Sequence, residues 1–414
     1  MSELLQKAAT AKQITKQLAL KTTEQKNKAL LAMAKQLIEN KNEILTENKR
    51  DQEAGRKNGL SESLIDRLAL NEQRIIAMAE GIEQVASLND PIGDILETRT
   101  RPNGLQIEKI RVPLGVIGMV YEARPNVTVD ASSLCLKTGN AVLLRGSSSA
   151  LYSNKAIVKF LGRALEKVDY PIEAIQLLED TSRETASELF QLNEYIDVLI
   201  PRGGSGLIQT VVKNATIPVL ETGVGNCHIY IDASANKEMA LSIAINAKTQ
   251  RPSVCNAAET ILVHQSWAKQ HLATMIQELT DKKVEIFTDE FTLWEYPHVN
   301  KANEHDWVDE YLDYKVALKV VNNLNEAIQH IDKYGTKHSE AIVSEDATSV
   351  EAFLNQVDAA AVYHNASTRF TDGFEFGFGA EIGISTQKLH ARGPMGLEAL
   401  TSTKYKVLGN GQIK

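Results

Sequence analysis

The sequence predicts an α/β protein with two parallel-sheet α/β domains and a small β-hairpin arm. Three observations lead to this fold class. Residues 1–90 have helical patterns, residues 114–220 alternate between short apolar runs and helical stretches, and this alternation restarts after residue 225. Apolar runs separated by helices are typical of a parallel sheet that is covered on both faces. A chain of 414 residues is long enough for two or three domains.

Within residues 1–90, two helix starts can be located from the pattern of polar and apolar residues. Thr22 and Gln25 have the spacing of a capping box. Asn71 is a suitable N-cap for a helix whose apolar residues, beginning with Ile75, recur at helical spacing. We expect these apolar faces to pack onto the rest of the protein.

The next segment, residues 98–112, changes character. Asn103-Gly104 is a strong hairpin-turn signal, and apolar residues alternate on its C-terminal side. This pattern predicts a β-hairpin arm.

The two alternating regions give the expected strands and helices. In the first region we expect strands at 116–121, 141–144, 175–178, 198–200 and 218–220, and helices at 129–138, 153–168, 183–191 and 206–212. Gly139 is well placed to end the first of these helices. In the second region we expect strands at 260–264, 316–321, 341–343 and 360–363, and helices at 239–248, 268–279, 326–333 and 349–356. Residues 373–383, rich in glycine and phenylalanine, predict a mobile or close-packed loop.

Composition excludes several functional classes. The formal net charge of −8 argues against a nucleic-acid partner, which would call for a basic patch. No apolar run approaches the roughly 18 residues of a membrane span, and no secretory signal is recognisable. The three cysteines are widely spaced, and the nine histidines show no metal-ligand spacing. We expect a cytoplasmic protein without a metal.

Cys255 is the leading candidate for a catalytic residue. It lies in the polar, loop-like stretch Gln250-Arg251-Pro252-Ser253-Val254-Cys255-Asn256-Ala257, between a predicted helix and a predicted strand. A neighbouring cation favours the reactive thiolate, and a thiolate can accept an acyl group. Most free cysteines are instead small buried apolar residues, so this stretch alone leaves both interpretations open. Cys135, inside a predicted helix, is expected in the core. Cys227 and His228 are adjacent in an extended segment and should point to opposite faces.

Two turns are candidates for binding a nucleotide. Gly203, Gly204 and Ser205 follow one predicted strand and precede a helix, an arrangement in which backbone N–H groups can approach a phosphate. A tight turn that needs glycine is the simpler explanation. Arg145, Ser147 and Ser148 end another strand and would suit a ribose or a ribose phosphate, although Ser147 or Ser148 could equally cap a helix.

The remaining candidates are charged residues. Glu221 follows the last strand of the first region and could act as a base, although a lone glutamate is more often solvated. Several cations lie in turn-like segments and could gather around an anionic substrate, or else be solvated individually: Arg124, Arg251, Arg369, Lys388, His390 and Arg392.

Taken in order, these features resemble the aldehyde dehydrogenase superfamily over essentially the whole chain. Pro113-Leu114-Gly115-Val116-Ile117-Gly118 resembles the strand that enters its cofactor domain, and Pro201-Arg202-Gly203-Gly204-Ser205 resembles the turn under the pyrophosphate. The resemblance implies that Cys255 is the nucleophile, Asn126 an oxyanion donor and Glu221 a third catalytic residue. The role of Glu221 stays open between a general base and a structural or proton-shuttling part. The implied cofactor-binding residues are Arg145, Ser147, Ser148, Gly203, Gly204, Ser205, Gly223 and Glu310.

Four longer strings are similar to one branch of this superfamily: residues 121–126, 250–257, 365–370 and 379–386. This similarity implies NADPH-dependent reduction of L-glutamyl 5-phosphate to L-glutamate 5-semialdehyde in proline biosynthesis, through a Cys255 thioester. Ser148 stands where NAD-preferring members often have a glutamate, which favours NADP. Arg124, Arg251, Arg369, Lys388 and His390 would bind the phosphate and the α-carboxylate. The alternatives are a general NAD(P)-dependent aldehyde dehydrogenase that releases an acid, and a cofactor-free thiol acyltransferase.

The resemblance also implies a division of the chain. Residues 1–97 and 113–225 would form the NADP-binding domain, and residues 226–384 the catalytic domain. Residues 98–112 and 385–414 would form an oligomerisation arm, in a homodimer or homotetramer. An upstream glutamate kinase is a further expected partner.

Overall fold

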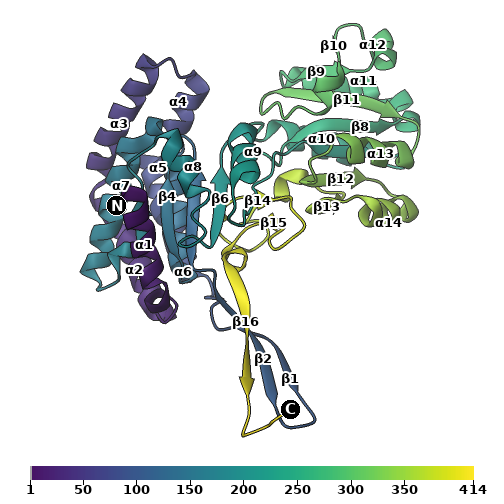
Figure 1. Cartoon of the computed structure of the whole chain (residues 1–414). Helices are drawn as coiled ribbons and strands as arrows, with labels where there is room; N and C mark the ends of the chain where they lie inside the picture. Colours follow the sequence, from purple (N-terminus) through teal and green to yellow (C-terminus); the bar gives the residue numbers. More distant parts are fainter. Residues whose placement is uncertain (1) are drawn as a thin grey trace. The chain divides into compact units, whose positions relative to one another are not determined.

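The computed structural model describes residues 2–414, which divide into two compact units (Figure 1). The first unit comprises the chain up to Thr222 together with residues 377–383 and 395–414. The second unit comprises residues 223–376 and 384–394. In the described part of the chain, no helix combines the length and the apolar character needed to cross a membrane.

Five helices open the first unit. Thr22 and Gln25 form both bonds of a capping box, and the Asn71 side chain accepts a hydrogen bond from the Arg74 N–H at 2.7 Å. Both predicted helix starts are therefore confirmed. The five helices are α1 (Glu3–Leu18), α2 (Thr23–Glu39), α3 (Lys41–Lys57), α4 (Glu62–Leu68) and α5 (Glu72–Ser87).

The first unit is built on a four-stranded parallel sheet in the order β5-β4-β3-β6. Its strands are β3 (Val116–Tyr121), β4 (Ala141–Arg145), β5 (Ile175–Leu177) and β6 (Val198–Arg202), and its helices are α6 (Pro125–Lys137), α7 (Leu151–Lys167), α8 (Arg183–Leu189) and α9 (Ser205–Asn214). Gly139 has a φ of +71° just after α6, as expected of the glycine that ends a helix. The strand expected at 218–220 is wrong: only a single bridge between Leu199 and Val219 forms there.

The N-terminus of α7 is capped from another helix. The Asp51 carboxylate on α3 accepts hydrogen bonds from the N–H groups of Tyr152 and Ser153, at 3.2 and 2.7 Å. Ser147 precedes the short 3-10 helix η1 (Ser148–Ala150), where its hydroxyl bonds to that of Ser149 at 2.6 Å and makes no capping bond. A side-chain cap by Ser147 is therefore not what fixes this turn.

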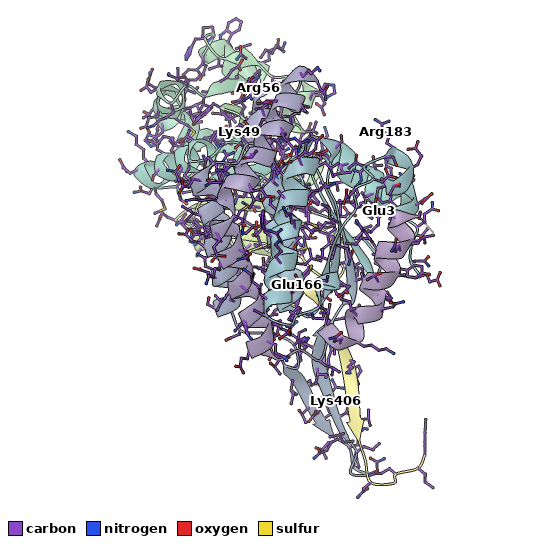
Figure 2. The ribbon with its side chains drawn as sticks, turned by 90° about the vertical axis from the view of Figure 1, so that its left-hand side faces the viewer. Glu3, Lys49, Arg56, Glu166, Arg183 and Lys406 are labelled. Atoms are coloured by element: carbon purple, nitrogen blue, oxygen red, sulfur yellow. The ribbon has the colours of Figure 1, made fainter. Side chains whose placement is uncertain are left out.

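A three-stranded antiparallel sheet in the order β1-β2-β16 also belongs to the first unit. It consists of β1 (Ile95–Thr100), β2 (Gln106–Pro113) and β16 (Thr401–Leu408). Gly104 has a φ of +86° and its N–H donates to the Arg101 carbonyl at 2.9 Å, which confirms the predicted hairpin turn. In Figure 2, Lys406 marks this sheet, whereas Glu166 lies on α7 and Glu3 at the start of α1.

The segment assigned to the arm at 385–414 is divided between the two units. Residues 395–414 lie with the first unit and residues 384–394 with the second. In the second unit, β14 (Ile384–Ser385) pairs with β15 (Gly393–Pro394), and Asp358 forms ion pairs with Lys388 and Arg392. The proposed oligomerisation role of the arm stays a prediction.

The second unit contains a seven-stranded parallel sheet in the order β10-β9-β11-β8-β7-β12-β13 (Figure 1). Its strands are β7 (Cys227–Ile231), β8 (Ala258–His264), β9 (Glu285–Thr288), β10 (Asn300–Lys301), β11 (Lys315–Val321), β12 (Ser339–Val343) and β13 (Ala361–His364). Its helices are α10 (Lys237–Thr249), α11 (Gln265–Asp281), α12 (Glu290–Glu295), α13 (Leu324–Tyr334) and α14 (Ala347–Gln356). Ile229 and Ile231 of β7 pack in the core formed with α10 and α11, whereas Tyr230 packs in the core formed with α13 and α14.

Candidate active site

Cys255 lies in the loop between α10 and β8, and its main chain is tightly enclosed. The residue is half-buried, whereas Cys135 and Cys227 are fully buried. A Cβ atom at Gly225 would come within 1.5 Å of the Cys255 carbonyl oxygen, so only glycine fits there. The Cys227 thiol donates a hydrogen bond to the same oxygen at 3.2 Å. Two contacts from the start of the second unit therefore fix the backbone of the candidate nucleophile.

Cys227 itself has the features of a structural thiol. Burial raises its pKa well above the usual range, and the charge of Glu340 raises it further. Its sulfur lies 3.6 Å from Nδ1 of His338, whereas His228, the next residue, bonds through Nδ1 to the Glu340 carboxylate at 2.9 Å. The prediction that Cys227 and His228 do not pair with each other is confirmed.

A buried ion pair joins the two ends of the cysteine loop. Lys248, in the last turn of α10, lies 2.6 Å from Glu259 on β8, and both side chains are fully buried. Burial raises the pKa of Glu259 to about 7, against the opposing charge and hydrogen bond of Lys248, and burial lowers the pKa of Lys248. Glu259 also accepts a hydrogen bond from the Leu312 N–H at 3.2 Å.

One of the predicted substrate-binding cations, Arg369, lies within electrostatic reach of both Cys255 and a second predicted cation, Arg251. Burial lowers the pKa of Arg369, and the positive charge of Arg251 lowers it further, while Cys255 is among the groups that raise it. The Arg369 guanidinium is oriented by a 2.8 Å hydrogen bond to the Gln250 side chain. Arg251, Arg369 and Cys255 therefore form one charged neighbourhood.

Lys388 and Arg392 belong to a different cluster. They lie 2.9 and 2.7 Å from the Asp358 carboxylate, and Lys337 lies 3.3 Å from it. The hydrogen bond from Lys388 is the largest of the effects that hold the pKa of Asp358 far below its usual range. His390 is exposed and has a φ of +63°, and Arg124 is exposed at the N-cap of α6 in the first unit. A substrate contact by any of these cations stays a prediction.

Glu310 and Gly223 both make structural contacts within the second unit. Glu310 accepts a hydrogen bond from the Gly225 N–H at 2.7 Å, so it supports the glycine that packs against Cys255. A Cβ atom at Gly223 would lie 2.4 Å from Cγ2 of Thr386, and the Gly223 N–H donates to the Ile384 carbonyl at 2.7 Å. Their cofactor-binding roles stay predictions.

In the first unit, Asn126 lies at the start of α6, just beyond the carboxyl end of β3. It is exposed, and its amide Nδ2 donates a hydrogen bond to Oδ2 of Asp130 at 3.1 Å. Burial raises the pKa of Asp130 to about 6, opposed by the Asn126 bond and by the charge of Arg202. Sequence reasoning missed Asp130, although its i+4 spacing from Asn126 was a usable signal.

Arg145 lies at the carboxyl end of β4, where a cofactor-binding residue was predicted. Its Nη2 donates to the carbonyls of Thr181 and Ser182, at 2.7 and 3.1 Å. Burial lowers the pKa of Arg145, and its Nε is a buried donor with no acceptor among the described residues. Ser148, nearby in the chain, is exposed.

The glycine turn at 203–204 is occupied by a carboxylate. The Glu122 side chain accepts a hydrogen bond from the Gly204 N–H at 2.9 Å, and a Cβ atom at Gly203 would lie 2.7 Å from the carboxyl carbon of Glu122. Glu122 would have to move before Gly204 could bind a phosphate. The N-terminus of α9, which begins at Ser205, is the better anion-binding feature of this turn. Glu221 is half-buried in the segment that follows, and its role stays a prediction.

Comparisons with known proteins show which family has this architecture. Residues 2–317 match the model of the aldehyde dehydrogenase family. The chain is 66% identical to the gamma-glutamyl phosphate reductase of Halalkalibacterium halodurans and 62% identical to that of Anoxybacillus flavithermus, in each case over 100% of both chains. A crystal structure of gamma-glutamyl phosphate reductase from Thermotoga maritima superposes with a TM-score of 0.97, at 51% identity over 100% of both chains.

The chain therefore belongs to the aldehyde dehydrogenase family, and its α/β fold is the aldehyde dehydrogenase-like fold predicted from the sequence. Within that family, the two full-length relatives named above are gamma-glutamyl phosphate reductases, the branch that the four strings indicated.

Proposed function

We propose that this protein reduces L-glutamyl 5-phosphate to L-glutamate 5-semialdehyde with NADPH and releases phosphate, as a step of proline biosynthesis. The name shared by its full-length relatives supports the substrate. The observation that carries the chemistry is the setting of Cys255. Its backbone is fixed by Gly225 and Cys227, while Arg369 lies within electrostatic reach.

The first half of the proposed reaction is acyl transfer to sulfur. The Cys255 thiolate attacks the δ-carbonyl carbon, the carbon–oxygen bond to phosphate breaks, and phosphate leaves with that electron pair. Arg251 and Arg369 are suited to the leaving phosphate, because guanidinium groups bind phosphate oxygens in a bidentate manner. The product of this half-reaction is a thioester on Cys255.

Negative charge develops on the carbonyl oxygen during this attack. The Cys255 backbone N–H and the Asn126 side-chain amide are the proposed donors to that oxygen. Removing one such donor typically lowers kcat by about 100- to 1,000-fold. The Asn126 amide is already oriented, since one of its N–H groups bonds to Asp130.

The residues at the carboxyl end of β4 fit the proposed NADP. Arg145 has a buried, unpaired Nε and a guanidinium held by two carbonyls, and no carboxylate stands at the neighbouring Ser148. Such a site suits the 2′-phosphate of NADP, and the N-terminus of α9 suits the pyrophosphate. When bound, this cofactor supplies the hydride that reduces the thioester carbon. The Cys255 sulfur then leaves as a thiolate and the aldehyde is released.

Phosphate dependence in the reverse direction tests this proposal. The enzyme should reduce NADP in the presence of L-glutamate 5-semialdehyde only when inorganic phosphate or arsenate is added. Cys255→Ser should abolish turnover and leave NADPH binding largely intact, whereas Cys135→Ser, at a cysteine buried in the first unit, serves as the matched control. Acid formation without phosphate would instead support a general aldehyde dehydrogenase, and absence of NADPH binding a cofactor-free acyltransferase.

The same proposal includes assembly as a homodimer or homotetramer through the three-stranded sheet. Strand β16 is an edge strand, and its Tyr405, Val407 and Leu408 side chains are 63, 55 and 51% exposed. An open edge strand with apolar side chains is a template for pairing with another strand. Light scattering in solution checks the assembly, and a monomer would contradict it.

A cytoplasmic location and delivery of the acyl phosphate by a glutamate kinase remain predictions.

A further inference from the structure

Asp130 lies one helical turn from Asn126, on the same face of α6. Residues four apart on a helix have Cβ atoms about 5–6 Å from each other. The 3.1 Å hydrogen bond from Asn126 to Asp130 demonstrates that these two side chains meet. We infer that the Asp130 carboxylate binds the α-ammonium group of the substrate and so selects an amino-acid acyl group. This inference rests on the proposed function, in which Asn126 contacts the δ-carbonyl oxygen.

The length of a glutamyl group matches this spacing. Four bonds separate the δ-carbonyl carbon from the α-nitrogen, which span about 5 Å in an extended chain at about 1.5 Å a bond. A substrate whose carbonyl oxygen meets the Asn126 amide can therefore bring its ammonium group to a carboxylate one turn further along the helix. The longer acidic side chain, glutamate, at position 130 would change this distance.

Asp130 has an unused hydrogen-bonding position. Its Oδ2 accepts from Asn126, and no hydrogen bond to its Oδ1 is formed within residues 2–414. Three other carboxylates described above already have structural partners. Glu122 accepts from Gly204, Glu310 accepts from Gly225, and Asp358 is surrounded by three cations.

The charge on Asp130 is also incompletely balanced. The side chain is partly buried, and no lysine or arginine of the described chain lies within ion-pair distance of it. Arg202 contributes a favourable charge, but its guanidinium packs against the backbone of Gly383, where a Cβ atom would lie 2.8 Å from Nη1. A partly buried carboxylate without an ion-pair partner is unfavourable, and an ammonium group would supply the missing charge.

A comparison of two aldehydes tests this inference. L-glutamate 5-semialdehyde carries the α-ammonium group, and 5-oxopentanoate is the same molecule without it. Phosphate-dependent NADP reduction is measured for each aldehyde with the wild type, Asp130→Asn and Asn126→Ala. The ratio of variant to wild-type kcat/KM is taken separately for each aldehyde. Cyclisation lowers the concentration of open-chain amino aldehyde equally in the variant and wild-type assays, so its effect cancels from this ratio.

Asp130→Asn should lower kcat/KM for the amino aldehyde about 10- to 100-fold more than for 5-oxopentanoate, the range expected for a hydrogen bond between charged groups. Asn126→Ala should lower both by similar factors. Equal losses for the two aldehydes in Asp130→Asn, or no loss, would overturn the inference, because a residue that only orients Asn126 affects both.

Two further outcomes remain informative. If Asp130→Asn does not fold, the wild type alone tests the inference. Its kcat/KM for the open-chain amino aldehyde should exceed that for 5-oxopentanoate by about 10-fold or more. Equal values would overturn the inference. If the wild type oxidises neither aldehyde with phosphate, the proposed function fails as well, which is a different result from the loss of selectivity alone.

Discussion

The thiol of Cys227 donates a hydrogen bond to the backbone carbonyl of Cys255, 3.2 Å away. One cysteine thus supports the main chain of another. Burial and the charge of Glu340 keep the pKa of Cys227 high, so the supporting thiol stays neutral. Cys255, in contrast, is half-buried in a loop and lies within electrostatic reach of Arg369.

This difference predicts selective alkylation. Iodoacetamide at pH 7 to 8 should modify Cys255 in the folded protein and leave Cys135 and Cys227 unmodified, because both are buried and burial raises the pKa of each. Loss of activity should follow the modification of Cys255. Peptide mapping by mass spectrometry measures this, and labelling after unfolding in denaturant is the control. Modification of Cys227 ahead of Cys255 would contradict the assignment.

Gly225 gives a sharper test of how the nucleophile is held. Gly225→Ala should lower kcat by about 100-fold or more, since a displacement of the order of 1 Å can cost that much. The added Cβ would otherwise lie 1.5 Å from the Cys255 carbonyl oxygen, so the loop has to move. Gly162→Ala on α7 is the matched control, because its Cβ would meet no atom within 4 Å. We expect the control to keep full activity and to gain about 0.5–1 kcal/mol of stability. Similar kcat values for both variants would exclude a tight contact at Gly225.

The sequence predicted the elements that have clear local signals. Apolar runs located β3, β4 and β6, and the residues Thr22, Asn71 and Gly104 indicated a capping box, a helix start and a hairpin turn. These features depend on neighbours in the chain, which is why they could be recognised.

The missed features depend on distant partners. Strand β7 is central and fully buried, but it begins with Cys227 and His228, which contact His338 and Glu340, about 110 positions away in the chain. Likewise, the cap of α7 comes from Asp51, roughly 100 residues earlier. Lys248 and Glu259 each look like solvated charges in sequence, and only the fold makes them a buried pair. Asp130 was the exception, since its i+4 spacing from Asn126 is local.

The buried pair of Lys248 and Glu259 should be essential for the stability of the second unit. Lys248→Met leaves Glu259 as an unpaired buried charge, and breaking such a pair typically costs about 3–5 kcal/mol. Glu259→Gln, added to Lys248→Met, removes that charge while keeping an acceptor for the Leu312 N–H, so we expect the double variant to be more stable than Lys248→Met alone.

Tryptophan fluorescence during urea unfolding can measure this effect. The chain has three tryptophans, Trp267, Trp294 and Trp307, and all lie within the second unit. The midpoint for the double variant should fall between those of the wild type and Lys248→Met. Strictly additive losses in the double variant would contradict a coupled pair.

Asp130 should make the stability of the first unit depend on pH. Its pKa is raised from 3.8 to about 6 in the folded protein. Between these values the folded state holds a proton that the unfolded state releases. This contribution to stability is therefore fully present below about pH 4 and is lost as the pH rises through 6. Asp130→Asn cannot titrate and lacks this dependence. Calorimetry at pH 4.5, 5.5 and 7 should show the wild type losing stability relative to Asp130→Asn as the pH rises. A difference in Tm that stays constant over this range would mean that the Asp130 carboxyl group titrates alike in the folded and unfolded chains.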